Sequence, residues 1–152
     1  MKLNLETQEK KLDVLLCTIQ GQKDDEIKSH LARYFCIKIS GYLENVIKRL
    51  INIYCDGSSP QPIRNYIETE IKNITNLSEE KLLKFLGKFS ADWEDKVSRR
   101  LSDSHRSSLN SIISNRNNIA HGQTDSISPK IIEGYYIDIK EIVEILKAVI
   151  KK

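Results

Sequence analysis

The sequence has few of the residues that interrupt or cross-link a chain, with six glycines, three prolines and three cysteines in 152 residues. So little glycine and proline favours long regular elements over extended linkers. No apolar run approaches the length of about 18 residues that a transmembrane helix needs. The charged start MKLNLETQEKK also lacks the apolar stretch of a signal peptide. We therefore expect a cytoplasmic protein with one domain over residues 1–152.

The cysteines Cys17, Cys36 and Cys55 are far apart and form no CxxC or CxxH pair. This spacing excludes a zinc framework of paired ligands. Because their number is odd and each lies among apolar residues, we expect reduced thiols in or near the core. No metal site and no cofactor site are predicted. The net charge of +3 is compatible with a polyanionic partner but does not require one.

Helical periodicity runs through nearly the whole chain, and strand alternation is almost absent. An apolar stripe from Ile27 to Tyr54 marks a central helix of about 30 residues, and another stripe runs from Ile132 to Val149. Helices are predicted over residues 5–20, from 24 or 25 to a stop at 56–57, over 62–76, 79–88 and 90–101, from 102 or 103 to 121, and after 129. The predicted fold is all-α, a helical bundle with a long central helix and an insert of short helices.

Three residues in this pattern carry further expectations about packing. Ser40 and Gly41 are small residues inside the central helix, where a glycine costs about 1 kcal/mol relative to alanine. They predict a close crossing by another helix, in preference to a kink or a ligand contact. Trp93, the only tryptophan, is expected to anchor the core.

The segment that carries chemistry ends in RNNIAHG, residues 116–122. Gly122 is placed just past the end of the predicted helix, as a terminating glycine would be. At 100° per residue, Asn117 and His121 lie on the same side one turn apart, while Arg116 leans toward the apolar face. That apolar face is predicted to hold Leu109, Ile112, Ile113 and Ala120.

Arg116, Asn117 and His121 are together the parts that RNA cleavage without a metal needs. The negative end of a helix dipole favours the cationic form of a histidine, which suits acid or base work. An arginine holds a phosphate through two parallel hydrogen bonds, and an asparagine orients an imidazole or a phosphate oxygen. In such a reaction a base takes the 2′-hydroxyl proton, the oxygen attacks phosphorus, and an acid protonates the leaving 5′ oxygen.

One histidine cannot easily be both base and acid in the same step, so this chemistry favours a homodimer that brings two copies of His121 together. Small side chains along one side of the same helix offer a surface for close approach. A solvated serine face remains an equally open interpretation of that surface. Its members are Ser104, Ser107, Ser111, Ser114, Asn118 and His121.

The bare Arg-x4-His spacing is a weak signal, because Arg100 and His105 match it as well. That second pair spans a predicted helix start, so its members are not expected to share a face. His30 is expected to be a surface or partly buried histidine. Glu44 either orients groups of the active site or bonds to a neighbouring helix, and the second role is favoured.

At RNNIAHG the sequence resembles the HEPN superfamily, helical bundles with an Arg-x4-6-His motif near the end of the penultimate core helix. The stretches ISGYLENVIKRLI and LLKFLGKFSADWEDKV resemble the RiboL-PSP type of HEPN domain. The resemblance implies a metal-independent endoribonuclease, with Arg116 and His121 of both subunits lining one cleft. It further implies a bacterial toxin or antiphage defence effector that acts on cellular RNA, with an antitoxin or defence-system protein as partner.

Two other interpretations of the same residues stay open. In the first, a non-catalytic helical dimer binds RNA, a nucleotide or a protein, and Arg116 anchors a phosphate. In the second, Arg116 is only a charged residue at the edge of the core, and His121 with Gly122 is an ordinary helix end. Nothing in the sequence indicates the RNA target. Basic residues that could flank an RNA groove, or simply face solvent, are Lys48, Arg49, Arg99, Arg100 and Arg106.

Overall fold

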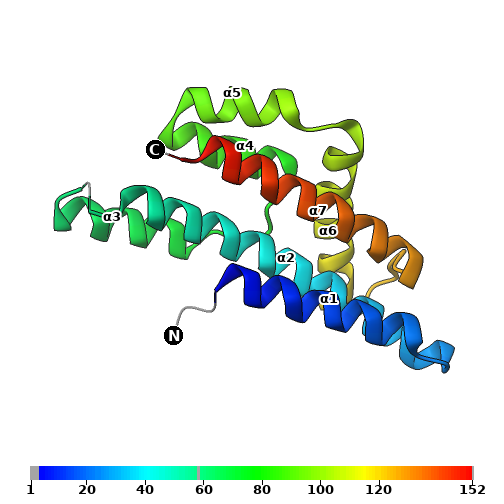
Figure 1. Cartoon of the computed structure of the whole chain (residues 1–152). Helices are drawn as coiled ribbons and strands as arrows, with labels where there is room; N and C mark the ends of the chain where they lie inside the picture. The colour runs from blue at the N-terminus through cyan, green and yellow to red at the C-terminus, as the bar shows by residue number, and fades with distance from the viewer. Residues whose placement is uncertain (1–3, 58, 152) are drawn as a thin grey trace.

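The computed structural model describes residues 4–57 and 59–151. These residues form seven helices and no strand, which confirms the all-α prediction. In chain order the helices are α1 (Leu5–Gly21), α2 (Asp25–Cys55), α3 (Gln61–Lys72), α4 (Glu79–Phe89), α5 (Ala91–Arg100), α6 (Asp103–Ala120) and α7 (Pro129–Val149), as Figure 1 shows. None of these helices is long and apolar enough to cross a bilayer.

Most helices begin where a short polar side chain accepts a hydrogen bond from the first turn. The Asp24 carboxylate accepts from the N–H of Ile27 at the start of α2, at 3.0 Å. Ser78, Ser90 and Ser102 cap α4, α5 and α6 in the same way. The boundaries of α1, α2, α4, α5 and α6 therefore agree with the sequence patterns to within one or two residues.

The core lies where the long central helix α2 meets α1, α6 and α7. In Figure 1, α1 and α7 run along α2, while α6 crosses behind them. The ring of Phe35 on α2 meets that of Tyr136 on α7 edge to face, with centroids 5.3 Å apart. The α4–α5 pair packs on α6 and α7. There Trp93 is 8% exposed and its ring lies 4.8 Å from that of Tyr54, which confirms its role as a core anchor.

The third helix is shorter than predicted, since α3 ends at Lys72 and not at residue 76. The connection that follows buries Ile74 and Leu77 and has a positive φ of 55° at Asn76. Glu44 of α2 holds this connection, because its Oε1 accepts from the N–H of Asn76 at 2.9 Å. The bond assigns Glu44 a structural role, as favoured from the sequence.

The predicted close crossing of another helix at Ser40 and Gly41 of α2 is confirmed for Ser40 and wrong for Gly41. Ser40 is 3% exposed and lies among Leu109, Ile112 and Ile139 of α6 and α7. A methyl group added to Gly41 would meet no atom within 4 Å. Gly41 instead lines an open hollow on the other side of α2.

Two other predictions of burial were only partly right. All three cysteines are free thiols, but only Cys36 is buried, Cys55 is half-buried and Cys17 is exposed. On α6, Leu109 and Ile112 are buried, whereas Ala120 is exposed because the helix ends there, beyond the edge of the core.

Candidate functional site

The site is built on the last turn of α6. This helix lies against α2 and α7 and ends at Ala120. The N–H of His121 donates to the carbonyl of Asn117 at 3.0 Å, which completes the turn. Gly122 follows with a φ of 65°, a left-handed conformation that glycine adopts without strain. The predicted helix end is thereby confirmed, with the RNNIAHG motif at its C-terminus.

Arg116 points into the hollow that Gly41 leaves open. The hollow has a volume of about 410 Å³ and lies between α1 and α2, where Leu12 and Ile37 supply apolar walls. Arg116 is half-buried there, as its expected lean toward the apolar face requires. An arginine in this setting packs its stem on apolar atoms and keeps its guanidinium available for an anion.

Asn117 and His121 are both exposed at the end of α6. Within the described ranges, no residue forms a hydrogen bond or ion pair with the side chains of Arg116, Asn117 or His121. The structure thus places all three on one helix end with their polar atoms free. Other polar residues of α6 have structural partners, among them Ser104, Arg106 and Asn115.

Asn115 is such a neighbour, and its importance was missed in the sequence. It is 4% exposed, and its Oδ1 accepts from both the N–H and the hydroxyl of Ser126, at 2.9 and 3.1 Å. Arg33 of α2 bonds to Asp125 at 2.9 Å in the same segment. These bonds fix the connection that leads from His121 to α7. The only signal was a polar residue at a position where the helical pattern expects burial.

Replacing Asn115 by alanine is expected to lower the free energy of unfolding by about 1–3 kcal/mol, because it removes both bonds to Ser126 and leaves a gap. Urea denaturation measures the change. Asn117→Ala is the matched control on the same helix and is expected to unfold like the wild type. Equal stability of the two variants would show that Asn115 does not hold the connection.

Electrostatics near Arg116 exclude one alternative nucleophile. Burial, together with the negative charge of Asp125, raises the pKa of the Cys36 thiol to about 12, and the nearby Arg116 opposes this only in part. A thiol in this environment is not ionised at neutral pH and does not act as a nucleophile. Cys36 is therefore not a candidate nucleophile for this site.

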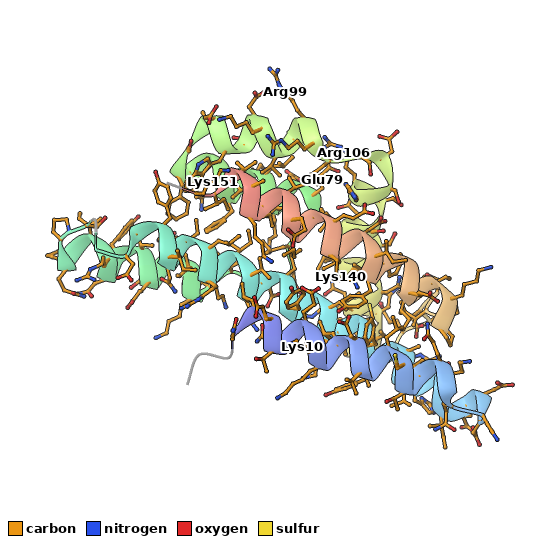
Figure 2. The ribbon with its side chains drawn as sticks, in the orientation of Figure 1. Lys10, Glu79, Arg99, Arg106, Lys140 and Lys151 are labelled. Atoms are coloured by element: carbon orange, nitrogen blue, oxygen red, sulfur yellow. The ribbon has the colours of Figure 1, made fainter. Side chains whose placement is uncertain are left out.

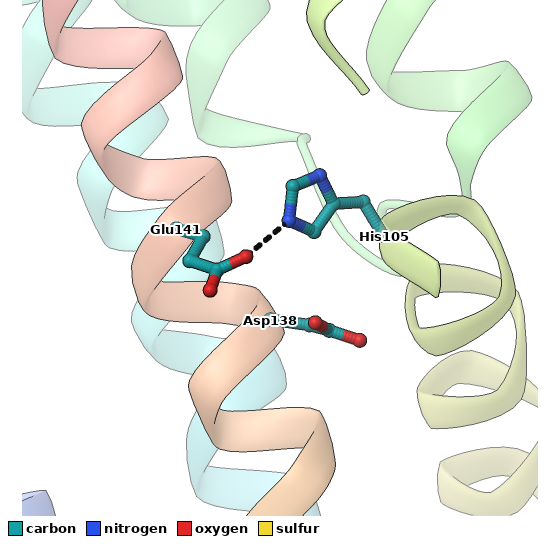
Figure 3. A group of neighbouring side chains, drawn as sticks. All are labelled: His105, Asp138 and Glu141. Atoms are coloured by element: carbon teal, nitrogen blue, oxygen red, sulfur yellow. Dashed lines mark hydrogen bonds and ion pairs between the residues drawn. The ribbon is translucent and has the colours of Figure 1, made fainter. Parts of the chain in front are cut away.

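His105 has a structural role at the other end of α6. Its Nδ1 accepts from the N–H of Ser102 at 3.1 Å, while the Ser102 hydroxyl accepts from the N–H of His105. Its Nε2 lies 2.6 Å from a carboxylate oxygen of Glu141 on α7 (Figure 3). Arg100 is the last residue of α5, so the second Arg-x4-His pair spans a helix break as predicted. His30 is exposed on α2.

His105, Asp138 and Glu141 are close enough together to suggest a metal site (Figure 3). The hydrogen bonds do not fit that use. Because Nδ1 accepts a backbone N–H, the proton of the neutral ring is on Nε2, which then donates to Glu141 and has no lone pair for a metal. Asp138 already accepts from the hydroxyls of Ser104 and Ser108. The cluster joins α6 to α7.

Replacing His105 by alanine is expected to destabilise the protein by about 1–3 kcal/mol, since it removes half of the capping box and the bond to Glu141. Thermal or urea unfolding tests this. His30→Ala removes an exposed histidine and is expected to leave the unfolding midpoint unchanged. If both variants unfolded alike, the cluster would contribute nothing to the fold.

The basic residues that could flank an RNA groove differ in whether they have a partner within the fold. Arg106 pairs with Glu79 of α4 and bonds to the backbone of Ser98, and Figure 2 shows Arg106 and Glu79 close together. Arg99 pairs with Asp95 on α5. Lys48 and Arg49 line a hollow and have no hydrogen-bond or ion-pair partner among the described residues.

The row of small residues on α6 does not form a single free face. The Ser104 hydroxyl donates to Asp138 at 2.8 Å, so this end of the row lies toward α7. Ser107 and Ser114 are exposed, and Ser111 and Asn118 are half-buried. Ser114 is the exposed serine of the row nearest to His121.

The comparisons with known proteins agree with the helical fold and the motif at its end. The family model RiboL-PSP-HEPN matches residues 4–152. No curated protein and no solved structure shows a significant match. HEPN domains are generally of the ribonuclease or RNA-binding type, and they commonly dimerise. Because the family model covers nearly the whole chain, the protein belongs to the RiboL-PSP-HEPN family.

Proposed function

We propose that this protein is a metal-independent endoribonuclease that cleaves RNA by attack of a 2′-hydroxyl, as a bacterial toxin or antiphage defence effector. The observation that carries the proposal is the free helix end, where Arg116, Asn117 and His121 have no hydrogen-bond or ion-pair partner among the described residues. Polar side chains left unpaired on a rigid helix are available to a ligand. Family membership supports an RNA ligand.

In the proposed reaction the guanidinium of Arg116 binds the scissile phosphate and stabilises the added negative charge of the transition state. One His121 imidazole removes the 2′-hydroxyl proton, and the freed oxygen attacks phosphorus. The imidazolium of a second His121 donates its proton to the leaving 5′ oxygen. The products are a 2′,3′-cyclic phosphate and a 5′-hydroxyl. Asn117, one turn before His121, orients the ring or a phosphate oxygen.

The two histidines come from two copies of the chain, because each chain has one free histidine at this helix end. His105 cannot substitute, since both of its ring nitrogens are bonded within the fold. We propose a homodimer in which the open part of α6 near Ser114 and Asn118 faces its twofold copy. This arrangement would place both motifs in one cleft.

The test is incubation of the purified protein with total RNA and transfer RNA in excess EDTA, followed by analysis of the fragment ends. Fragments that end in a 2′,3′-cyclic phosphate are expected, in the same yield with and without the chelator. Tight binding of intact RNA with no product, at concentrations where the protein is dimeric, would replace the proposal with a non-catalytic RNA-binding dimer. Loss of cleavage in EDTA would contradict a metal-independent reaction.

A further inference from the structure

A furrow leads away from Arg116 across α1, α2 and α3. Next to the hollow that holds Arg116 lies a larger one of about 760 Å³, between the start of α1, the second half of α2 and the end of α3. In Figure 1, α3 follows the C-terminal half of α2, and α1 begins near the middle of α2. Gln8 and Asn45 line both hollows, so the two adjoin and form one furrow.

The charge of the furrow is strongly positive. The hollow around Arg116 is also lined by Lys11 and Lys38 and by no acidic residue. The larger hollow adds three basic residues against one acidic residue, Glu68. The three are Lys48, Arg49 and Lys72. No hydrogen bond or ion pair holds these three side chains within the described ranges. A row of free cations of this kind attracts the phosphates of a nucleic acid backbone.

Side-chain amides alternate with these cations. Gln8, Asn45, Asn52 and Asn65 all line the larger hollow. Gln8 Oε1 is buried and has no hydrogen-bond partner, which leaves an unsatisfied acceptor in the wall that the two hollows share. A buried acceptor without a partner is costly unless a ligand or water satisfies it. Amides both donate and accept, and so match the edges of unpaired bases.

We propose that this furrow binds the single-stranded RNA that extends from the cleavage site, with phosphates at Lys48 and Arg49 and base edges at Gln8 and Asn45. The inference rests on the proposed function, because it takes Arg116 as the position of the scissile phosphate. A single strand fits better than a duplex, since the Watson–Crick edges of its bases are unpaired and can bond to the amides. An acidic protein segment would satisfy the cations as well, but the RNA-binding character of the family favours RNA.

The test measures binding alone, so that it remains informative if no cleavage is found. The probe is a fluorescent single-stranded RNA of mixed sequence whose 2′-hydroxyls are all methylated, which removes the nucleophile. Lys48→Glu/Arg49→Glu is expected to weaken binding about tenfold or more, and to reduce the slope of log K against log salt by about 0.7 for each lost phosphate contact. Arg99→Glu/Arg100→Glu is the matched control on α5, where Figure 2 shows Arg99 pointing away from the rest of the chain. It is expected to change the affinity less than twofold.

A third variant tests whether the two hollows bind the same RNA strand. Asn45 is exposed in the shared wall, so Asn45→Glu is expected to fold normally and to weaken binding severalfold. Circular dichroism and the unfolding midpoint confirm the fold of each variant. Equal affinities of the Lys48/Arg49 variant and its control for the RNA probe would overturn the proposal that the furrow binds RNA. Equal binding of duplex RNA, or competition by a polyglutamate peptide as strong as by RNA, would overturn the assignment of a single strand.

Discussion

Replacing His121 by alanine is expected to lower the rate of RNA cleavage by at least about 10²- to 10⁴-fold, since a positioned general acid or base contributes this much to a rate. Every site of a homodimeric variant would lack both its proton acceptor and its proton donor. Single-turnover cleavage of a defined RNA in EDTA measures the loss. RNA binding should change little, because the main phosphate contact is assigned to Arg116.

The chain offers its own controls for this variant, because its other two histidines have different environments. His30→Ala is expected to cleave RNA at the wild-type rate. His105→Ala is expected to be less stable, yet active below its unfolding temperature. His121→Ala should unfold like the wild type, since the imidazole is exposed and has no bond to a described residue. Full activity in His121→Ala would show that the reaction centre lies elsewhere.

Replacing Arg116 by alanine is expected to lower cleavage by about 10²- to 10³-fold, the usual cost of removing a group that stabilises developing charge. Arg116→Lys keeps the charge but loses the two parallel hydrogen bonds to a phosphate, so it should recover only part of this loss. Comparing the single-turnover rates of the two variants separates charge from geometry. The free energy of unfolding should change little, because the guanidinium has no partner among the described residues.

The matched control for Arg116 is Arg106, ten residues earlier on the same helix. Arg106 is bonded to Glu79 and to the backbone of Ser98, so its role is structural. Arg106→Ala should therefore lower stability and leave the cleavage rate of the folded protein unchanged. If the Arg116 and Arg106 variants lost activity equally, the effect would reflect general positive charge on α6 and not a phosphate contact at the motif.

Most helix boundaries were predictable because the signals that set them are local. Ser78, Ser90 and Ser102 cap helices with their own hydroxyls, and Gly122 ends α6 through its own left-handed backbone. The end of α3 was mispredicted because its cause is distant in sequence. Glu44, more than one helix earlier, binds the N–H of Asn76 and holds the following connection away from helical geometry.

The surroundings of the site were less predictable than the motif itself. Spacing alone placed Arg116 toward the core, but whether it met a helix or an open hollow depended on how α1 packs on α2. Gly41 was expected to meet another helix and instead lines that hollow. Ser104 was expected on a face open to solvent or to a second copy, and Asn115 carried no prediction, yet both bond to partners beyond α6. Such bonds depend on tertiary packing, which a helical pattern does not contain.

The most direct test of the central claim uses a mixed dimer with one wild-type subunit and one His121→Ala subunit, purified through two different affinity tags. Because the proposed cleft needs both copies of His121, one as base and one as acid, the mixed dimer should be about as inactive as the His121→Ala homodimer. About half of the wild-type activity would contradict the shared site, since it would mean that each subunit cleaves RNA with its own histidine. Failure to recover any mixed dimer after co-expression would contradict the proposed dimer itself.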